Sequence, residues 1–169
     1  KYGELTLREN QIAYAEPIFF RLFDFELLKG DKKTCLSMPG QVVITERIAS
    51  KYFKDEDPIG KIFIFTGAYD KISCEVTGVM KEMPSNSHIH YSFLISYKSL
   101  PKYMQEYWYK HEAYTYVLLD SPERKAEIER EFPVMAEKYK TDEALKNKTW
   151  GVSLIPLADI HLTPQVGYE

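Results

Sequence analysis

The segment that most constrains the fold of this chain is residues 41–60, QVVITERIASKYFKDEDPIG. Its β-branched start, residues 42–44, predicts a short strand. Thr45 comes next, and its hydroxyl can accept a hydrogen bond from an amide in the first helical turn, which predicts a helix over residues 46–53. The DEDPIG end then predicts a tight turn, because its proline disfavours helix in the preceding residue and its glycine has turn freedom.

The predicted helix is amphipathic. Its apolar residues recur at helical spacing and are expected to be buried, whereas its polar residues are expected to face water. The expected buried residues are Ile48, Ala49, Tyr52 and Phe53, and the expected exposed residues are Arg47, Ser50, Lys51 and Lys54.

Strand patterns flank this segment on both sides. The expected strands cover residues 5–16, 61–65, 72–80 and 89–95, with a loop at 84–87. Pro17 opens a predicted helix over residues 17–25, and Gly30 is a natural stop after it. The apolar stripe of that helix would be Ile18, Phe19, Leu22 and Phe23. Together these elements predict a β-meander carrying one helix, which is an α+β arrangement.

The second half of the chain has its own pattern. Residues 113–119 and 149–156 each predict a strand, and Ser121, with a proline and an acid after it, predicts the start of a helix between them. The stripe of that helix would be Ile128, Phe132, Met135 and Tyr139, and Pro133 is expected to kink or interrupt it. This order indicates a βαβ-like unit, so the chain is expected to form two lobes divided between residues 98 and 110.

Charge and hydropathy exclude two classes of function. The formal net charge is −3, and the basic residues form no concentrated face, so binding to nucleic acid is not expected. No run of 18 apolar residues is present to span a bilayer. The chain begins at Lys1 rather than at a methionine, which favours a segment excised from between two transmembrane helices.

The sequence carries no clear catalytic or metal-binding pattern. His88 and His90 would share one face of the predicted strand and could form a metal site with His161 or Asp159, but strand-edge histidines are the favoured interpretation. The chain has no G-x-S-x-G, G-x-G-x-x-G or Walker A motif, and its aspartates mostly lie beside turn signals. We therefore predict no catalytic, cofactor-binding or metal-binding residues, and no enzymatic activity.

Two further features bear on function, a pair of cysteines and a cluster of aromatic residues. Cys74 alternates with Ile72 and Val76 and is expected to face the core, whereas Cys35 lies in a loop-like segment, and the sequence leaves open whether the two form a disulfide. A cluster of aromatic residues in a predicted loop is interpreted either as a partner surface or, preferentially, as a roof over the core. These residues are Tyr103, Tyr107, Trp108 and Tyr109.

Five segments carry a resemblance to known proteins. They are EPIFFRLFDFELLKGD (16–31), VVITERIASKYFKDEDPIGK (42–61), VTGVMKEMPSNSHIHYSFLIS (76–96), YTYVLL (114–119) and LIPLADIHLTP (154–164). In this order they resemble the periplasmic core domain of Bacteroidetes-type MacB and FtsX-like ABC transporter permeases. The two cysteines depart from the family pattern, in which small apolar residues would be expected.

The resemblance implies an α+β architecture with a porter-like α/β lobe and a smaller β-rich inserted lobe. Residues 1–16 would end the first porter-like segment, and residues 17–107 would form the inserted lobe with short helices. Residues 108–169 would be the returning porter-like βαβ segment, leading to a transmembrane helix. The first porter strand and helix would lie upstream of Lys1, so the domain would be truncated at its N-terminus.

The resemblance also implies a location and a function. The chain would be a periplasmic domain of a bacterial inner-membrane permease, coupling cytoplasmic ATP hydrolysis to efflux or to mechanical control of a partner. Its partners would be the cognate cytoplasmic ATPase subunit or domain, a second permease copy and a periplasmic adaptor or other protein, with no cofactor. The alternative is a soluble periplasmic module that binds a ligand or a protein without catalysis.

Overall fold

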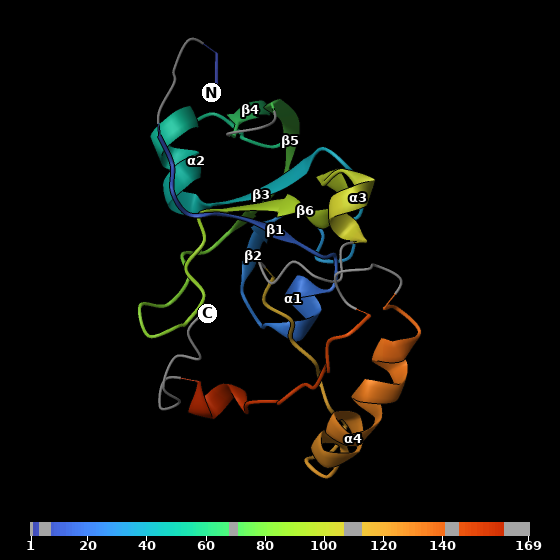
Figure 1. Ribbon diagram of the computed structural model, residues 1–169. Coiled ribbons are helices and arrows are strands. Elements are labelled where there is room, and N and C mark those ends of the chain that lie inside the picture. The colour runs from blue at the N-terminus through green and yellow to red at the C-terminus, as the bar shows by residue number, and fades with distance from the viewer. Residues whose placement is uncertain (1, 4–7, 68–70, 107–112, 141–145, 161–169) are drawn as a thin grey trace. The chain divides into compact units, whose positions relative to one another are not determined.

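The computed structural model describes residues 2–3, 8–67, 71–106, 113–140 and 146–160 (Figure 1). The chain divides into two compact units, Lys1–Gln105 and Glu106–Glu169, which we call unit 1 and unit 2. Among the described residues no helix is both long enough and apolar enough to cross a membrane. The domain limits expected from the resemblance remain predictions.

Unit 1 is built on a six-stranded mixed sheet of order β1-β6-β3-β5-β2, in which β4 also pairs with β5 (Figure 1). The strands are β1 (Ile12–Ala15), β2 (Leu27–Lys29), β3 (Gln41–Thr45), β4 (Ile62–Thr66), β5 (Lys71–Met80) and β6 (Phe93–Ser96). The pairs β1–β6 and β3–β5 are parallel, and the pairs β3–β6, β2–β5 and β4–β5 are antiparallel.

The predicted α+β class is confirmed, but the predicted meander is wrong. β3 lies between β5 and β6, so it pairs with strands that follow it by some thirty and fifty residues in the chain. A parallel pair requires a crossover connection, and α2 (Glu46–Phe53) together with β4 supplies the one between β3 and β5. Alternation of residue types indicates a strand, but it does not indicate that strand's neighbours.

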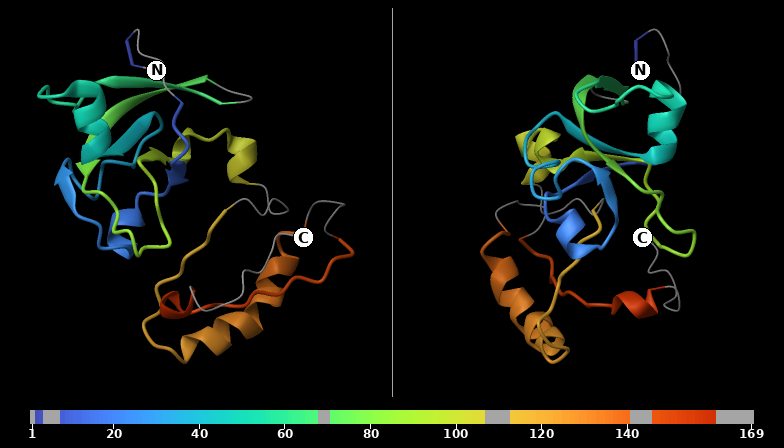
Figure 2. Two further views of the ribbon diagram at one scale, coloured as in Figure 1. Left: turned by 90° about the vertical axis from the view of Figure 1, so that its left-hand side faces the viewer. Right: turned by 180° about the vertical axis from the view of Figure 1, so that it is seen from behind.

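Helices α2 and α1 (Phe19–Leu22) lie on opposite sides of the sheet (Figure 1, Figure 2). The core consists of two clusters, one that includes buried residues of α2 and one that includes the buried residue of α1. Buried members of the α2-side cluster are Val42, Ile44, Ile48, Phe53, Phe63, Cys74, Val76, Val79, Phe93 and Ile95. Buried members of the α1-side cluster are Ala15, Phe20, Cys35, Leu36, Val43, Met80 and Leu94. Because neighbours along β3 and β6 alternate between the clusters, the sheet is buried on both faces.

A β-bulge keeps β5 in phase with both clusters. Val42 pairs with Val76, but Val43 pairs with Gly78, so Thr77 is the extra residue on β5. The Thr77 hydroxyl donates to the carbonyl of Cys35 at 2.5 Å. Without the bulge, the apolar end of β5 would present its side chains to the wrong faces.

Helix α2 forms as the sequence predicts. Thr45 is fully buried and is the N-cap, and its Oγ1 accepts a hydrogen bond from the Ile48 amide at 3.4 Å. Ile48 and Phe53 are buried, and Ala49 and Tyr52 pack at the edge of the α2-side cluster. The four polar residues expected in water are exposed.

Replacing Thr45 by valine should lower the free energy of unfolding by about 1 kcal/mol, because the Ile48 amide loses its acceptor while the side-chain shape is kept. Urea denaturation measures this change. Thr45→Ser, which keeps the hydroxyl, is the matched control and should retain most of the cap. Equal stability of the valine variant and the wild type would contradict a capping role.

Three predicted elements are shorter in the structure. The helix predicted over residues 17–25 is the four-residue α1, whose buried residue is Phe20, while Ile18 is half exposed. The strands predicted over 5–16 and 89–95 are reduced to β1 and β6, although residues 4–7 lie outside the described part of the chain.

β2 was not predicted. Its three residues form a strand only because β5 offers them an edge.

Unit 2 contains α4 (Arg124–Glu137), which begins close to the predicted start and continues through Pro133 without interruption. The strands predicted at 113–119 and 149–156 are wrong, since those residues are described and carry no strand. Strand propensity becomes a strand only when a neighbouring strand is present to accept its hydrogen bonds. The remaining short elements are η1 (Tyr97–Ser99) and α3 (Lys102–Gln105) in unit 1 and η2 (Leu157–Asp159) in unit 2.

Candidate functional site

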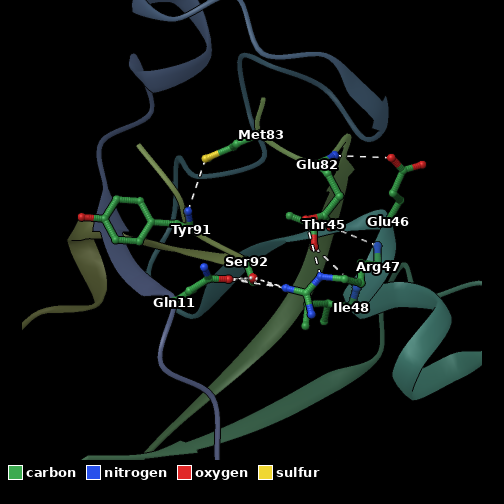
Figure 3. A network of polar contacts seen from close by, with 9 residues as sticks. All are labelled: Gln11, Thr45, Glu46, Arg47, Ile48, Glu82, Met83, Tyr91 and Ser92. Atoms are coloured by element: carbon green, nitrogen blue, oxygen red, sulfur yellow. Dashed lines mark hydrogen bonds and ion pairs between the residues drawn. The ribbon is translucent and has the colours of Figure 1, made fainter. Parts of the chain in front are cut away.

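Polar side chains gather where the residue before β1, the start of α2 and the residue before β6 meet (Figure 3). We call Gln11, Arg47, Glu82 and Ser92 the Arg47 cluster. The Arg47 Nη2 donates to Ser92 Oγ at 2.7 Å and lies 3.4 Å from Gln11 Oε1. Ser92 Oγ in turn donates to Gln11 Oε1 at 2.7 Å. One amide oxygen, one hydroxyl and one guanidinium thus connect three elements of unit 1.

Glu82 completes the cluster from the segment after β5. Its Oε2 lies 3.6 Å from Arg47 Nε, and its Oε1 accepts from the Arg47 backbone amide at 3.3 Å. The Glu82 amide donates to Glu46 Oε1 at 3.4 Å. Both carboxylates lie at the N-terminus of α2, where negative charge is favoured by the helix dipole and by the free amides of the first turn.

The backbone fixes the positions of these side chains. The Gln11 carbonyl accepts from the amides of Ser92 at 2.8 Å and Phe93 at 3.0 Å, and the Ser92 carbonyl accepts from the Thr45 amide at 3.0 Å. The side-chain contacts of the cluster therefore extend the β1–β6 and β3–β6 hydrogen bonding by one residue.

A second polar contact ties the same N-terminal segment to α2. Glu9 Oε1 lies 2.6 Å from Lys51 Nζ and accepts from the Tyr52 hydroxyl at 2.9 Å. Burial by itself raises the pKa of Glu9, but the hydrogen bonds from Lys51 and Tyr52 and the charges of Lys51 and Arg47 outweigh it, so the pKa is lowered. Burial, and then the Glu9 carboxylate, raise the pKa of Tyr52.

The lowered pKa of Glu9 predicts a pH dependence of stability. Its stabilisation is complete above the unfolded-state value of about 4.3 and is lost as the pH falls through the lower folded-state pKa. Glu9→Gln should therefore lower the free energy of unfolding at pH 7 by on the order of 1 kcal/mol and flatten its decline in acid. Urea titrations at pH 7 and pH 3 measure both effects.

The control for Glu9 is Glu26→Gln, which removes a well-exposed ion pair with Lys81. Exposed pairs contribute little, so the acid slope of this variant should match that of the wild type. A Glu9→Gln variant with the wild-type acid slope would contradict the assignment.

Each unit has a hollow among its described residues, and the one in unit 1 is too small for an organic ligand. A cavity of about 40 Å³ borders the Arg47 cluster and is lined by Gln11, Glu82, Met83, His90, Tyr91 and Ser92. This volume holds a few water molecules, whereas sites for organic ligands occupy about 300–1,000 Å³. A second hollow, of about 340 Å³, lies on unit 2 and is lined by Val117, Leu118, Leu119, Asp120, Arg124 and Ile128.

The chemistry of the cluster is that of an anchor. The Ser92 hydroxyl donates a hydrogen bond to the Gln11 amide oxygen, which is not a base, so nothing in these contacts activates the hydroxyl as a nucleophile. Arg47 is paired with Glu82 and bonded to Ser92. The described residues contain no group of three or more His, Cys, Asp or Glu side chains that could hold a metal ion.

The two histidines considered for a metal site are not on a strand. β6 begins at Phe93, so His88 and His90 lie in the loop before it, and the shared strand face that was predicted is wrong. The His88 ring lies 6.4 Å from that of Phe23. Asp159 belongs to η2, and His161 is outside the described residues.

The two cysteines are buried and free in the structure. Cys74 faces the α2-side cluster, as predicted, and Cys35 faces the α1-side cluster, so the sheet lies between the thiols. Burial raises the pKa of each thiol to about 11.

Thiol titration of the protein unfolded without reductant should therefore find two free thiols. In the native protein both should react slowly, because they are buried and are protonated at neutral pH. Titration before and after reduction is the control. A gain of two thiols on reduction would establish the disulfide that the sequence leaves open.

The aromatic cluster falls mostly outside the described residues. Tyr103 lies on α3 and is 59% exposed, while Tyr107, Trp108 and Tyr109 are not described. The partner surface therefore remains a prediction.

The sequence did not indicate the Arg47 cluster. Arg47 was expected only to face water, and Gln11, Glu82 and Ser92 carried no motif. Their contacts join residues 35 to 81 positions apart, for which a single sequence holds no local signal.

Comparisons with known proteins relate this fold to one family. A family model described as the MacB-like periplasmic core domain matches residues 1–133. A comparison with curated proteins found no match.

Two solved structures are similar to the chain. One is a domain of a provisionally named permease protein from Porphyromonas gingivalis, with a TM-score of 0.67, 20% identity and coverage of 85% of this chain and 65% of that one. The other is the periplasmic region of MacB from Actinobacillus actinomycetemcomitans, with a TM-score of 0.45, 19% identity and coverage of 59% and 43%. The chain thus spans less than two thirds of either structure, and the first likeness establishes the fold.

Proposed function

Because the chain belongs to the family of MacB-like periplasmic core domains, we propose that it is the extracytoplasmic domain of an ABC transporter permease in a bacterial inner membrane. In this role it couples cytoplasmic ATP hydrolysis to the movement of a periplasmic substrate or partner. The observation that carries the proposal is the family match over residues 1–133, and the fold shared with the Porphyromonas gingivalis domain supports it.

The geometry of unit 1 supports a mechanical rather than a catalytic role. The sheet is buried on both faces, and the Arg47 cluster and Glu9 fasten the segment before β1 to α2 and β6. A unit with these contacts moves as one body when its ends are displaced, since packed cores do not deform continuously. We assign no enzymatic reaction and no cofactor to it.

The partners follow from the same proposal. They are the cognate cytoplasmic ATPase subunit or domain, a second copy of the permease, and a periplasmic adaptor or other protein. Nucleotide binding would act at the ATPase, and the periplasmic domains of the two permease copies would shift relative to each other.

Distance measurements on spin-labelled full permease, purified with its ATPase, test the proposal. One label per copy at Glu75→Cys, an exposed position on β5, reports the distance between copies. This distance should change between the ATP-bound state of a hydrolysis-deficient ATPase and the ADP-bound state. Two labels within one copy, at Glu75→Cys and Lys98→Cys, are the control and should keep their distance.

The proposal would be overturned if no ATPase co-purified with the permease. It would also be overturned if the distance between copies were the same in the ATP-bound and ADP-bound states. A changed distance within one copy would instead show that unit 1 deforms and does not move as one body.

A further inference from the structure

The first and last strands of the unit 1 sheet are neighbours. β1 and β6 pair in parallel over four residues, from Ile12 with Phe93 to Ala15 with Ser96 (Figure 1). In a parallel pair the start of one strand lies beside the start of the other. The chain therefore enters β1 at one end of this pair and leaves β6 at the opposite end.

This arrangement determines how the pair carries load. Tension between the entry to β1 and the exit from β6 pulls the strands past each other along their length, so the hydrogen bonds of the ladder share the force. Tension between the starts of both strands would open the same ladder one bond at a time. The first direction must break several bonds together and has the higher barrier, and forced unfolding is governed by the rate of crossing that barrier.

Side chains reinforce the loaded end of β1. The Gln11 carbonyl accepts from the Ser92 and Phe93 amides, and its Oε1 accepts from Ser92 Oγ. Two residues earlier, Glu9 holds Lys51 and Tyr52 of α2. The segment that would slide is thus fastened to two different elements.

β6 is fixed more firmly than β1. On its other edge β6 pairs antiparallel with β3, and its four residues are buried. Ser96 Oγ donates to the Leu36 carbonyl at 2.9 Å. Under tension β1 is therefore the strand that must move, and the β1–β6 ladder with its anchors is the contact that resists.

We propose that the β1–β6 pair is a mechanical clamp that makes unit 1 resist tension between its points of chain entry and exit. The resistance is a property of unit 1 itself. Its use in a permease rests on the proposed function, in which the tension would come from the membrane-embedded part of the protein.

Single-molecule force spectroscopy of the whole chain tests the clamp by changing only the second attachment point. One handle is fused to the N-terminus, and the other is attached to a thiol at Lys98→Cys, just after β6, or at Asn86→Cys, in the turn before it. Both positions are exposed, and the two native thiols are buried, so a handle reagent selects the new thiol. The Lys98 attachment shears the β1–β6 ladder, and the Asn86 attachment peels it.

At one loading rate, the Lys98 attachment should give a several-fold higher mean unfolding force than the Asn86 attachment. Contacts made before β1, such as that of Tyr2 with Phe53, are loaded in both geometries and do not affect the comparison. Equal forces, or a higher force from Asn86, would overturn the clamp.

A second variant tests the anchor. Gln11→Ala removes the side-chain contact with Ser92 and should lower the force from the Lys98 attachment, whereas Glu26→Gln, with its exposed ion pair, should not. Circular dichroism checks that each variant is folded. If Gln11→Ala does not fold, the comparison of the two attachment points alone tests the clamp.

The outcome is independent of the nucleotide experiment on the full permease. A clamp without nucleotide-dependent movement would leave this inference standing and remove the proposed function. Nucleotide-dependent movement without a clamp would support the proposed function and overturn this inference.

Discussion

Phe63→Ala should lower the free energy of unfolding of unit 1 by about 3–5 kcal/mol, which is the usual range for deleting a fully enclosed phenyl ring. Phe63 is 2% exposed at the centre of the α2-side cluster. Its ring contacts five other aromatic rings at centroid distances of 5.0 to 5.9 Å, those of Tyr2, Tyr52, Phe53, Phe65 and Phe93. They come from four segments, so no single movement fills the cavity.

Ile62→Ala is the matched control, since Ile62 is the neighbouring residue on β4 and is 48% exposed. It should cost under about 1 kcal/mol, because little of its side chain leaves water on folding. Urea denaturation followed by far-UV circular dichroism measures both variants. Similar losses for the two would mean that the aromatic cluster is not the centre of the core.

Gly30→Ala should destabilise the protein by about 2–5 kcal/mol, from about 1–2 for a side chain in a left-handed conformation and about 1–3 for forced displacement of neighbours. Gly30 has φ of +96°, and a Cβ there would collide with the carbonyl oxygen of Thr77 and come within 3.0 Å of Gly78 Cα. Both obstacles are backbone of β5 at its bulge, so they cannot rotate away. From the sequence, Gly30 was interpreted as a helix stop. In the structure it follows β2, and its lack of a side chain allows the backbone there to approach β5 closely.

Gly60→Ala separates the two contributions. Gly60 also has positive φ, +80°, but nothing lies within 4 Å of its Cβ position. This variant should therefore lose only the conformational part, about 1–2 kcal/mol. If denaturation midpoints show equal losses for the two alanine variants, the contact of Gly30 with β5 has no energetic consequence.

The features predicted correctly have short-range causes. The strand at residues 42–44, the Thr45 cap and the buried face of α2 depend on residues within one or two helical turns of one another, so their pattern is visible along the chain. The core position of Cys74 follows from alternation within a single strand. The family resemblance was likewise recognised from short segments of the sequence, and the family match confirms it.

The features that were missed depend on distant partners. Residues 113–119 have the composition of a strand but carry none, and the three residues of β2 form one beside β5. Both outcomes depend on whether a hydrogen-bonding edge is present, which composition does not record.

Propensity, periodicity and the order of short segments were therefore enough to predict the strand at residues 42–44, the capped helix α2, the α+β class and the family. Three features are visible only in the folded chain: β3 lies between β5 and β6, β1 pairs in parallel with β6, and Gln11, Arg47 and Ser92 meet. Strand order and side-chain clusters join residues separated by tens of positions. Their energy depends on how the whole sheet assembles and is absent from any local stretch of the chain.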